Sequence, residues 1–447
     1  MTITFSDLFA GIGGFHAVGE LFGWEHAYSC DINDPARRVY EQNWGCESAT
    51  DITLDATDGP VNIPKHDVLF AGFPCQPFSK SGKQHGMDEA RGTLFWNIAR
   101  ILEVKRPKVV LLENVPNLVG PRHTHEWEVI IKTLHSLGYR VSKTPFIVSP
   151  HKVSPEFGGR PQTRSRIYIA ATYVPAALRK KFPLDAENLS FEKYHSDWDP
   201  KKWNVLRDIS IDRKLPQSEF QELSISEAEE SWLSAWDDFL QKMLVARKDV
   251  QLPGFPFWAD VWLGNIKHSK NDPDWKTIFI NKNIEFYESH QRGIDAWLKK
   301  NNYLEDFPSS RRKFEWQGGN MKSLWDGLIQ LRPSGIRVKK ADYVPAAVAI
   351  TQTSVVGKLK RRLTVREVAR LQGLPEWFSF DGQSNTQSYK QLGNGISITT
   401  AYLAIKALVE RDKEILEKTS PELLKSVLKS HDNFGDHRKY TEIRSAG

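Results

Sequence analysis

The residues best suited to covalent chemistry lie in the segment Phe73-Pro74-Cys75-Gln76-Pro77-Phe78-Ser79. This segment follows Val68 to Phe70, a short apolar run typical of a strand buried on both faces of a parallel sheet. Ligands bind at the carboxyl edge of such strands, and the two prolines restrict the backbone around the Cys75 thiol. A second apolar run, Val109 to Leu112, brings Glu113 to the same edge. A thiol beside a carboxyl group indicates covalent catalysis with proton transfer; the plain alternatives are a buried cysteine and a turn carboxylate.

A glycine-rich turn near the N-terminus indicates a nucleotide-like ligand. The turn Phe9-Ala10-Gly11-Ile12-Gly13-Gly14 lies between an expected strand, Ile3 to Leu8, and a helical pattern. Glycines let the backbone approach a ligand, and the helix N-terminus favours an anionic group. The expected strand from Ala27 to Cys30 ends at Asp31, which can accept hydrogen bonds from ribose hydroxyls. Residue 16 is histidine, so the third glycine of nicotinamide sites is missing. On these residues alone, S-adenosylmethionine and a nicotinamide dinucleotide are equal candidates, and a tight turn with a capping aspartate is the plain alternative.

A sheet must bring these residues together, and the first 175 residues have the pattern of one. Short apolar runs alternate with helical spacing, as from Asp34 to Asn43 and at Leu94, Ile98, Ile101 and Leu102. This order predicts a doubly wound α/β sheet. Regular texture resumes at Leu363, and a further helix is expected after the glycine turn at Gly393 to Gly395.

The middle of the chain has an irregular texture that predicts a second, inserted domain. It is rich in tryptophan and carries basic clusters such as Arg311-Arg312-Lys313 and Arg337-Val338-Lys339-Lys340. We expect the tryptophans to pack in a core rather than to stack on bases, and a solvated surface is the default for each basic cluster. The predicted boundaries are a catalytic and cofactor-binding domain at 1–175, the inserted domain at 176–355, a connecting segment at 356–388 and returning helices at 389–447.

The amino-acid composition disfavours secreted, membrane-inserted and metal-binding proteins. The chain has 447 residues, 40% of them hydrophobic, and a net charge of +6, which is compatible with a polyanionic partner. Its three cysteines form no disulfide framework and no C-x-x-C zinc pair, so we expect no metal and a reducing cytoplasm. Because the sequence has no basic and apolar leader and no apolar run of about 18 residues, we expect neither secretion nor membrane insertion.

The ordered motifs together resemble the cytosine-C5 DNA methyltransferases. The resemblance covers about residues 3–173 and 345–408, and the irregular middle falls where the family has its target-recognition domain. It rests on Asp7-Leu8-Phe9-Ala10-Gly11-Ile12-Gly13-Gly14-Phe15, Gly72-Phe73-Pro74-Cys75-Gln76-Pro77-Phe78-Ser79, Glu113-Asn114-Val115, Gln162-x-Arg164-x-Arg166, Arg362-Leu363-Thr364-x-Arg366-Glu367 and Gln391-Leu392-Gly393-Asn394. It implies a Rossmann-like, S-adenosylmethionine-dependent methyltransferase sheet, with double-stranded DNA as the partner.

The resemblance also implies a set of cofactor contacts. Phe9 would lie against the adenine, Asp31 would hold the ribose hydroxyls, and Asn394 would contact the methionine part. Asp51 would meet the adenine edge. The full set implied at the pocket is Phe9, Gly11, Ile12, Gly13, Asp31, Ile32, Asp51, Ile52, Pro74 and Asn394.

The catalytic residues implied by the resemblance are Cys75, Glu113, Arg164 and Arg166. Cys75 would attack C6 of cytosine and make C5 nucleophilic. Glu113 would hydrogen-bond N3 and the exocyclic amine, and the two arginines would hold the base and a nearby phosphate. Arg166 could also favour the Cys75 thiolate.

Because the target atom is buried in duplex DNA, the resemblance also implies base flipping. The stretch from Ser79 to Arg91 would close over the flipped base, with Gln76, Ser79, Ser81 and Thr351 as DNA contacts. For Thr351 a buried strand threonine is an equal alternative.

Two departures from the family pattern bear on the site. One extra residue before Pro161-Gln162 predicts a bulge ahead of Arg164, and Gly395 replaces a common serine.

We weigh three other functions: an RNA cytosine methyltransferase, a nicotinamide oxidoreductase and a catalytically silent DNA-binding protein. The missing third glycine and the Pro-Cys-Gln-Pro segment disfavour the oxidoreductase, and the intact cysteine, glutamate and arginine set disfavours the silent protein. We expect a prokaryotic, cytoplasmic, nucleoid-associated modification enzyme. A monomer would suffice for the chemistry, with a cognate restriction endonuclease acting separately.

Overall fold

The chain forms two compact units. The computed structural model describes residues 2–74, 93–195, 198–209, 211, 214–346 and 353–431. The first unit comprises the described residues of Met1–Lys202, Ala346–Thr351 and Val368–Gly447, and the second those of Trp203–Pro345 and Gln352–Glu367.

The first unit is built on a sheet that is parallel on one side and antiparallel on the other. Within the described residues it has seven strands in the order β2-β1-β3-β4-β8-β5, and β6 also pairs with β8. The strands β1, β2, β3 and β4 run parallel, whereas β8 is antiparallel to β4. Their bounds are β1 (Thr4–Leu8), β2 (Glu25–Cys30), β3 (Val68–Ala71), β4 (Val109–Asn114), β5 (Tyr139–Arg140), β6 (Phe146–Val148) and β8 (Arg166–Tyr173).

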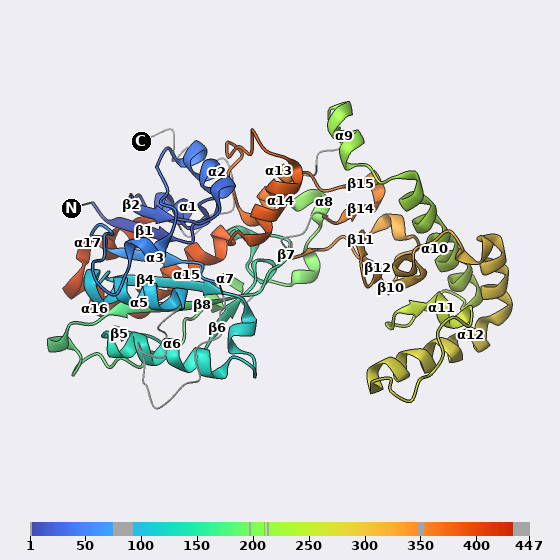
Figure 1. Ribbon diagram of the computed structural model, residues 1–447, viewed down its shortest axis with the longest axis horizontal. Coiled ribbons are helices and arrows are strands. Elements are labelled where there is room, and N and C mark those ends of the chain that lie inside the picture. The colour runs from blue at the N-terminus through green and yellow to red at the C-terminus, as the bar shows by residue number, and fades with distance from the viewer. Residues whose placement is uncertain are drawn as a thin grey trace. The chain divides into compact units, whose positions relative to one another are not determined.

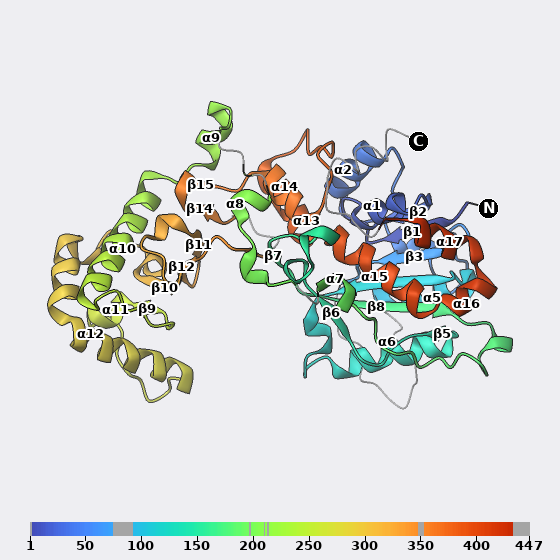
Figure 2. The ribbon, with the colours of Figure 1, turned by 180° about the vertical axis from the view of Figure 1, so that it is seen from behind.

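Helices cover both faces of this sheet, as Figures 1 and 2 show. On one face, α1 (Gly14–Leu21), α15 (Ile398–Arg411) and α17 (Pro421–Lys429) pack together, and Tyr168 of β8 is hydrogen-bonded to Thr400 of α15 at 2.7 Å. On the other face, α5 (Leu94–Lys105) and α6 (Thr124–Ser136) share an apolar core with β1, β3, β4 and β8. The predicted doubly wound α/β sheet is confirmed, and every residue of β3 and β4 is buried.

Shorter elements complete the first unit. The expected helix after Asp31 is α2 (Asp34–Trp44), whose N-cap Asn33 accepts a hydrogen bond from the Ala36 amide at 3.0 Å. The other elements of this unit are α3 (Ile52–Asp55), β7 (Gln162–Thr163), α7 (Glu192–His195), α14 (Asn385–Asn394) and α16 (Lys413–Thr419). The helix α13 (Val365–Gln372) begins in the second unit and ends in the first.

The unit boundaries differ from the predicted ones on both sides of the insertion. The described residues of 176–202 belong to the first unit, and part of this stretch packs along β5: Arg140 donates to the Asp185 carbonyl at 2.8 Å, and Val141 forms a β-bridge with Asp185. Residues 356–367, expected in a connecting segment, belong to the second unit.

Among the described residues, one helical stretch, Asn385–Arg411, is long and apolar enough to cross a membrane, and it includes α14 and α15. It meets the length and hydropathy of a membrane span, but 83% of its most apolar window is buried inside the protein. Such burial is typical of a helix in the core of a folded domain.

The second unit packs helices against a mixed sheet. Within the described residues the sheet has six strands in the order β15-β14-β11-β12-β10-β9. The strands are β9 (Phe257–Trp258), β10 (Lys313–Gln317), β11 (Leu328–Arg332), β12 (Gly335–Lys339), β14 (Val355–Val356) and β15 (Arg361–Arg362). The other elements are α8 (Val205–Asp208), α9 (Gln217–Leu223), α10 (Glu227–Ala246), α11 (Ala259–Trp262), α12 (Asp274–Lys300) and β13 (Val344–Pro345).

The core of the second unit is aromatic. Trp236 of α10 packs against Trp297 of α12 with ring centroids 4.9 Å apart, and stacks on Phe314 of β10. The expectation that the tryptophans form a core is confirmed for Trp203, Trp236, Trp258, Trp262, Trp297 and Trp316, which are all buried. Trp275 is an exception, because 58% of it is exposed.

Candidate active site

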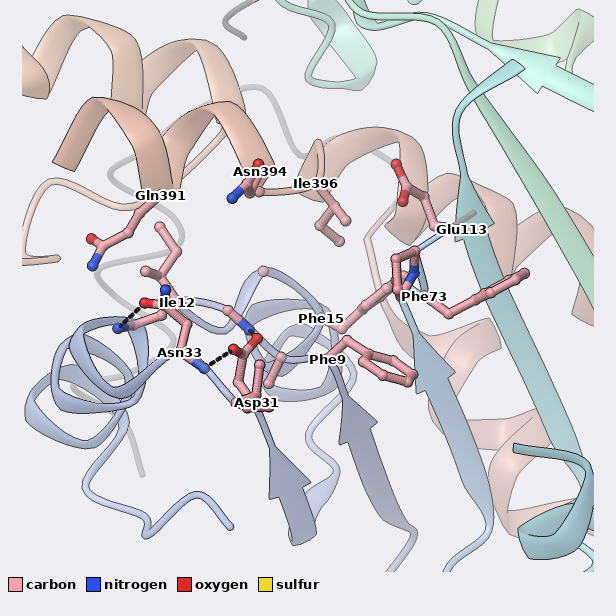
Figure 3. A pocket seen from close by; sticks show the side chains of 18 of the residues that line it. Phe9, Ile12, Phe15, Asp31, Asn33, Phe73, Glu113, Gln391, Asn394 and Ile396 are labelled. Atoms are coloured by element: carbon pink, nitrogen blue, oxygen red, sulfur yellow. Dashed lines mark hydrogen bonds between the residues drawn. The ribbon is translucent and has the colours of Figure 1, made fainter. Parts of the chain in front are cut away.

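A pocket of about 870 Å³ opens at the carboxyl edge of the parallel strands in the first unit. The strands β1, β2, β3 and β4 each end beside it, and α14 forms the opposite wall (Figure 3). Eleven residues predicted for the site line this pocket: Phe9, Gly11, Ile12, Asp31, Ile32, Asp51, Ile52, Pro74, Glu113, Arg166 and Asn394.

The glycine turn that follows β1 forms the pocket floor. Phe9, Gly11 and Gly13 all have positive φ, at 57°, 56° and 87°. A Cβ at Gly13 would lie 2.0 Å from Nε1 of Trp44, which donates a hydrogen bond to the Ile12 carbonyl at 2.9 Å. Gly13 is not among the residues that line the pocket, and its close approach to Trp44 shapes the turn; its predicted contact with the cofactor stays a prediction.

Two backbone donors hold the Asp31 carboxylate. Its Oδ2 accepts the Gly11 amide at 2.8 Å, and its Oδ1 accepts the Asn33 amide at 2.7 Å (Figure 3). A carboxylate has about four lone-pair sites, so each oxygen keeps acceptor capacity for a ligand hydroxyl. Asp51 is similarly held, because it caps α3 by accepting the Thr53 amide at 2.9 Å.

Aromatic side chains form the apolar part of the pocket. Phe9 and Phe15 lie between Asp31 and Glu113 in the view of Figure 3, and Phe73 lies near Glu113. Phe15 is fixed by stacking on Phe70 of β3, with centroids 4.9 Å apart. The pocket therefore offers a carboxylate, an apolar surface and a second carboxyl group in that order.

Glu113 and Arg166 form the polar end of the pocket. Arg166 Nε lies 2.8 Å from Glu113 Oε1, and only 8% of Glu113 is exposed. Burial raises the pKa of Glu113, and the charges of Arg166 and Arg164 oppose that rise. The group can therefore keep a proton at a pH where an exposed glutamate would lose it.

The structure separates the two predicted arginines. Arg166 begins β8 and lines the pocket, whereas Arg164 lies in the non-strand segment before it and is 1% exposed. The Arg164 guanidinium donates to the carbonyls of Gly393, at 3.0 Å, and Gly395. Burial lowers the pKa of Arg164 to about 9. Arg164 is not among the residues that line the pocket, and its expected contact with the base stays a prediction.

The extra residue before Pro161 is taken up in a tight turn. Gly158 has a φ of 82°, and a Cβ at Gly159 would lie 1.9 Å from the Val153 carbonyl oxygen. The irregular backbone expected ahead of Arg164 is therefore a glycine turn that ends before β7.

Five predicted residues lie outside the described part of the chain: Cys75, Gln76, Ser79, Ser81 and Thr351. The description reaches Pro74, which lines the pocket. Asn114 of β4 donates to the Phe73 carbonyl at 2.9 Å and so holds the chain two residues before Cys75.

Sequence reasoning missed several lining residues on α14. Gln387, Lys390 and Gln391 precede Asn394 by seven, four and three residues, which places all four on one helical face. This spacing was readable in the sequence once Asn394 had been singled out. Gln391 is held by reciprocal amide bonds with Gln383, at 2.9 and 2.7 Å.

Comparison with known proteins shows the family to which the chain belongs. A family profile described as "C-5 cytosine-specific DNA methylase" matches residues 3–410. The chain belongs to this family. It is 41% identical to the type II methyltransferase M.AluI of Cellulosimicrobium cellulans over 93% of this chain and 94% of the relative. It is 37% identical to M.HhaI of Haemophilus parahaemolyticus over 89% and 91% of the two chains.

The protein is therefore a DNA (cytosine-5-)-methyltransferase, and membership of the C-5 cytosine-specific DNA methylase family implies that it uses S-adenosylmethionine. The described pocket fits that molecule. It offers the anchored carboxylate of Asp31 for hydroxyl groups, the rings of Phe9 and Phe15 for a flat base, and Lys390 as a cation for a carboxylate.

The basic clusters of this methylase are largely engaged within its second unit. Arg312 pairs with Asp260 at 3.2 Å, and Arg337 with Glu315 at 3.0 Å. Arg311 donates to the Arg332 carbonyl at 2.8 Å, and Lys339 pairs with Asp342 at 2.6 Å. These four side chains are held by ion pairs and a hydrogen bond within the unit, which differs from the solvated surface expected by default for each cluster.

Proposed function

We propose that the protein methylates C5 of a flipped-out cytosine in one short, specific duplex DNA site, through a covalent bond between Cys75 and C6 of the base. The observation that carries this proposal is the Glu113–Arg166 ion pair at one end of a pocket whose other end holds the Asp31 carboxylate. This arrangement suits a base at one end and a nucleoside methyl donor at the other.

The donor's sulfonium supplies an electrophilic methyl group. Asp31 would hold its ribose hydroxyls, Phe9 would lie against its adenine, and Asn394 and Lys390 would bind its methionine part. The remaining lining residues, Gly11, Ile12, Ile32, Asp51, Ile52 and Pro74, surround it.

The chemistry on the base needs a nucleophile and an acid. The Cys75 thiolate adds to C6, and Glu113 gives a hydrogen bond to N3 that stabilises the charge developing in the ring. The raised pKa of Glu113 supports this role, because a carboxyl group that keeps its proton can donate to N3. C5 then takes the methyl group as the bond from that group to the sulfonium sulfur breaks, which would leave a neutral thioether. Water accepts the C5 proton, and the C–H electron pair forms the C5–C6 double bond and expels the Cys75 thiolate from C6, which restores the aromatic ring. Arg166 orients Glu113 throughout.

Other segments bind the DNA and hold the flipped base in the pocket. The stretch from Ser79 to Arg91 closes over the flipped nucleotide, and Gln76, Ser79, Ser81 and Thr351 contact the DNA. The second unit reads the target sequence. Relatives named as type II methyltransferases support a place in a restriction-modification system, beside a separate endonuclease. We further propose a cytoplasmic, nucleoid-associated monomer.

Covalent trapping tests the mechanism. A duplex target containing 5-fluorocytosine should give a stable protein–DNA adduct in the presence of S-adenosylmethionine, because fluorine at C5 cannot leave as a proton does. The adduct should be absent with Cys75→Ala and present with Cys46→Ala, a matched control for a cysteine outside the site. An adduct formed by Cys75→Ala would refute the assignment of the nucleophile. Methyl incorporation into RNA rather than duplex DNA would overturn the proposed substrate.

A further inference from the structure

The C-terminal end of α14 is held from outside by a buried arginine. Arg164 Nη2 donates to the Gly393 carbonyl at 3.0 Å and also to the Gly395 carbonyl. These two glycines flank Asn394, which lines the pocket. Both carbonyls next to Asn394 in the sequence are therefore bound by one guanidinium.

This contact satisfies groups that a helix end leaves open. The last four carbonyls of a helix have no partner within it, and their partial negative charge favours a nearby cation. Gln372 donates to the preceding carbonyl, that of Leu392, at 3.0 Å. Successive carbonyls at this helix end are thus fixed by side chains from elsewhere in the first unit.

Arg164 is itself firmly placed. Its backbone amide donates to Ser149 Oγ at 2.9 Å, and that hydroxyl is hydrogen-bonded to His151 Nδ1 at 2.8 Å. The side chain is 1% exposed. A guanidinium held this deeply acts on the groups around it, which include the backbone on either side of Asn394 and, through its charge, Glu113.

We propose that Arg164 is a positioning residue for the methyl donor: it acts through Asn394 by fixing the carbonyls of Gly393 and Gly395, and not through the DNA. This inference rests on the proposed function, in which Asn394 contacts S-adenosylmethionine. It gives the hydrogen bonds of the two neighbouring arginines different roles: those of Arg164 support the donor site, and the ion pair of Arg166 orients Glu113 toward the base.

A double-mutant cycle tests the inference. Calorimetric titration with S-adenosylmethionine would compare wild type, Arg164→Met, Arg164→Lys, Asn394→Ala and the Arg164→Met/Asn394→Ala double variant. Arg164→Met should weaken donor binding about tenfold, because bonds from a charged group are lost, and Arg164→Lys should weaken it less. In the Asn394→Ala background, the same Arg164→Met change should lower donor affinity by less than about twofold, because the effects of coupled residues are not additive.

Controls separate positioning from general destabilisation. Arg411→Met removes a half-buried arginine of the first unit, which donates to the Ala170 carbonyl at 3.2 Å, and it should leave donor affinity unchanged. Duplex DNA affinity should be the same in Arg164→Met as in wild type.

Three results would overturn the inference: additive effects in the cycle, unchanged donor affinity in Arg164→Met, or a loss of DNA affinity with donor affinity intact. If Arg164→Met does not fold, the Arg164→Lys variant tests the inference instead. A donor affinity in Arg164→Lys equal to that of wild type would refute it. Failure of the wild-type protein to bind the donor would instead refute the proposed function.

Discussion

Glu113 and Arg166 face each other from two neighbouring strands, with Arg166 Nε 2.8 Å from Glu113 Oε1. The strands β4 and β8 are antiparallel, and Glu113 pairs with Tyr168, two residues beyond Arg166. The sheet therefore sets the distance between the two groups. A carboxyl group this buried is tolerated because a cation compensates for the hydration that it has lost.

Removing the Arg166 side chain should impair Glu113 as the acid and leave binding of the methyl donor intact. Arg166→Met takes away the charge that most strongly opposes the rise in the pKa of Glu113, and it frees the carboxyl group to reorient. We expect the single-turnover rate of methyl transfer to fall by about 10²-fold or more. Donor affinity, measured by calorimetry, should stay within about threefold of wild type. A large loss of donor affinity with an unchanged rate would contradict the role given to Arg166.

The raised pKa of Glu113 predicts how stability varies with pH. Because the folded pKa lies above the ordinary value of 4.5, the folded state holds a proton that the unfolded state has released. The stabilisation is fully present below pH 4.5 and is lost as the pH rises through the folded pKa. Glu113→Gln lacks this titration, so it should gain stability relative to wild type as the pH rises from acid to neutral. Urea unfolding at a series of pH values checks this, and a difference that runs the other way would show that the pKa is lowered.

Two glycines of the turn after β1 should respond differently to the same change. Gly13→Ala brings a Cβ to 2.0 Å from Trp44 Nε1 at a φ of 87°, whereas Gly11→Ala meets no atom within 4 Å. We expect Gly13→Ala to lower the free energy of unfolding by about 3 kcal/mol, and Gly11→Ala by about 1 kcal/mol. Thermal melts compare the two. Equal losses would mean that the Trp44 contact does not constrain the turn.

The Asp31 carboxylate should matter for donor binding through its charge and its two acceptor oxygens. Asp31→Asn turns one acceptor into a donor that faces an amide, either that of Gly11 or that of Asn33. Donor affinity should fall about tenfold or more, measured by calorimetry. Asp185→Asn, which removes an exposed carboxylate paired with Lys143 at 2.7 Å, serves as the control and should bind normally. Similar donor affinity in the two variants would argue against a ribose contact at Asp31.

Local sequence patterns predicted the buried strands and the acidic residues that follow them. The strands from Val68 and Val109 are continuous apolar runs, and Asp31 and Glu113 follow from where the strands end. The long helix α10 was missed because its aromatic face obscured the spacing, although Ser226 and Glu229 form a capping box at its start. Arg164 could not be placed, because its partners are backbone carbonyls 229 and 231 residues away.

The most direct test of the account is bisulfite sequencing of DNA from cells that express the protein, beside cells that express Cys75→Ala. We expect cytosines protected from conversion at one position of one short duplex sequence, with no protection in the variant. Complete conversion at every site with the wild-type protein, or protection that survives Cys75→Ala, would contradict it.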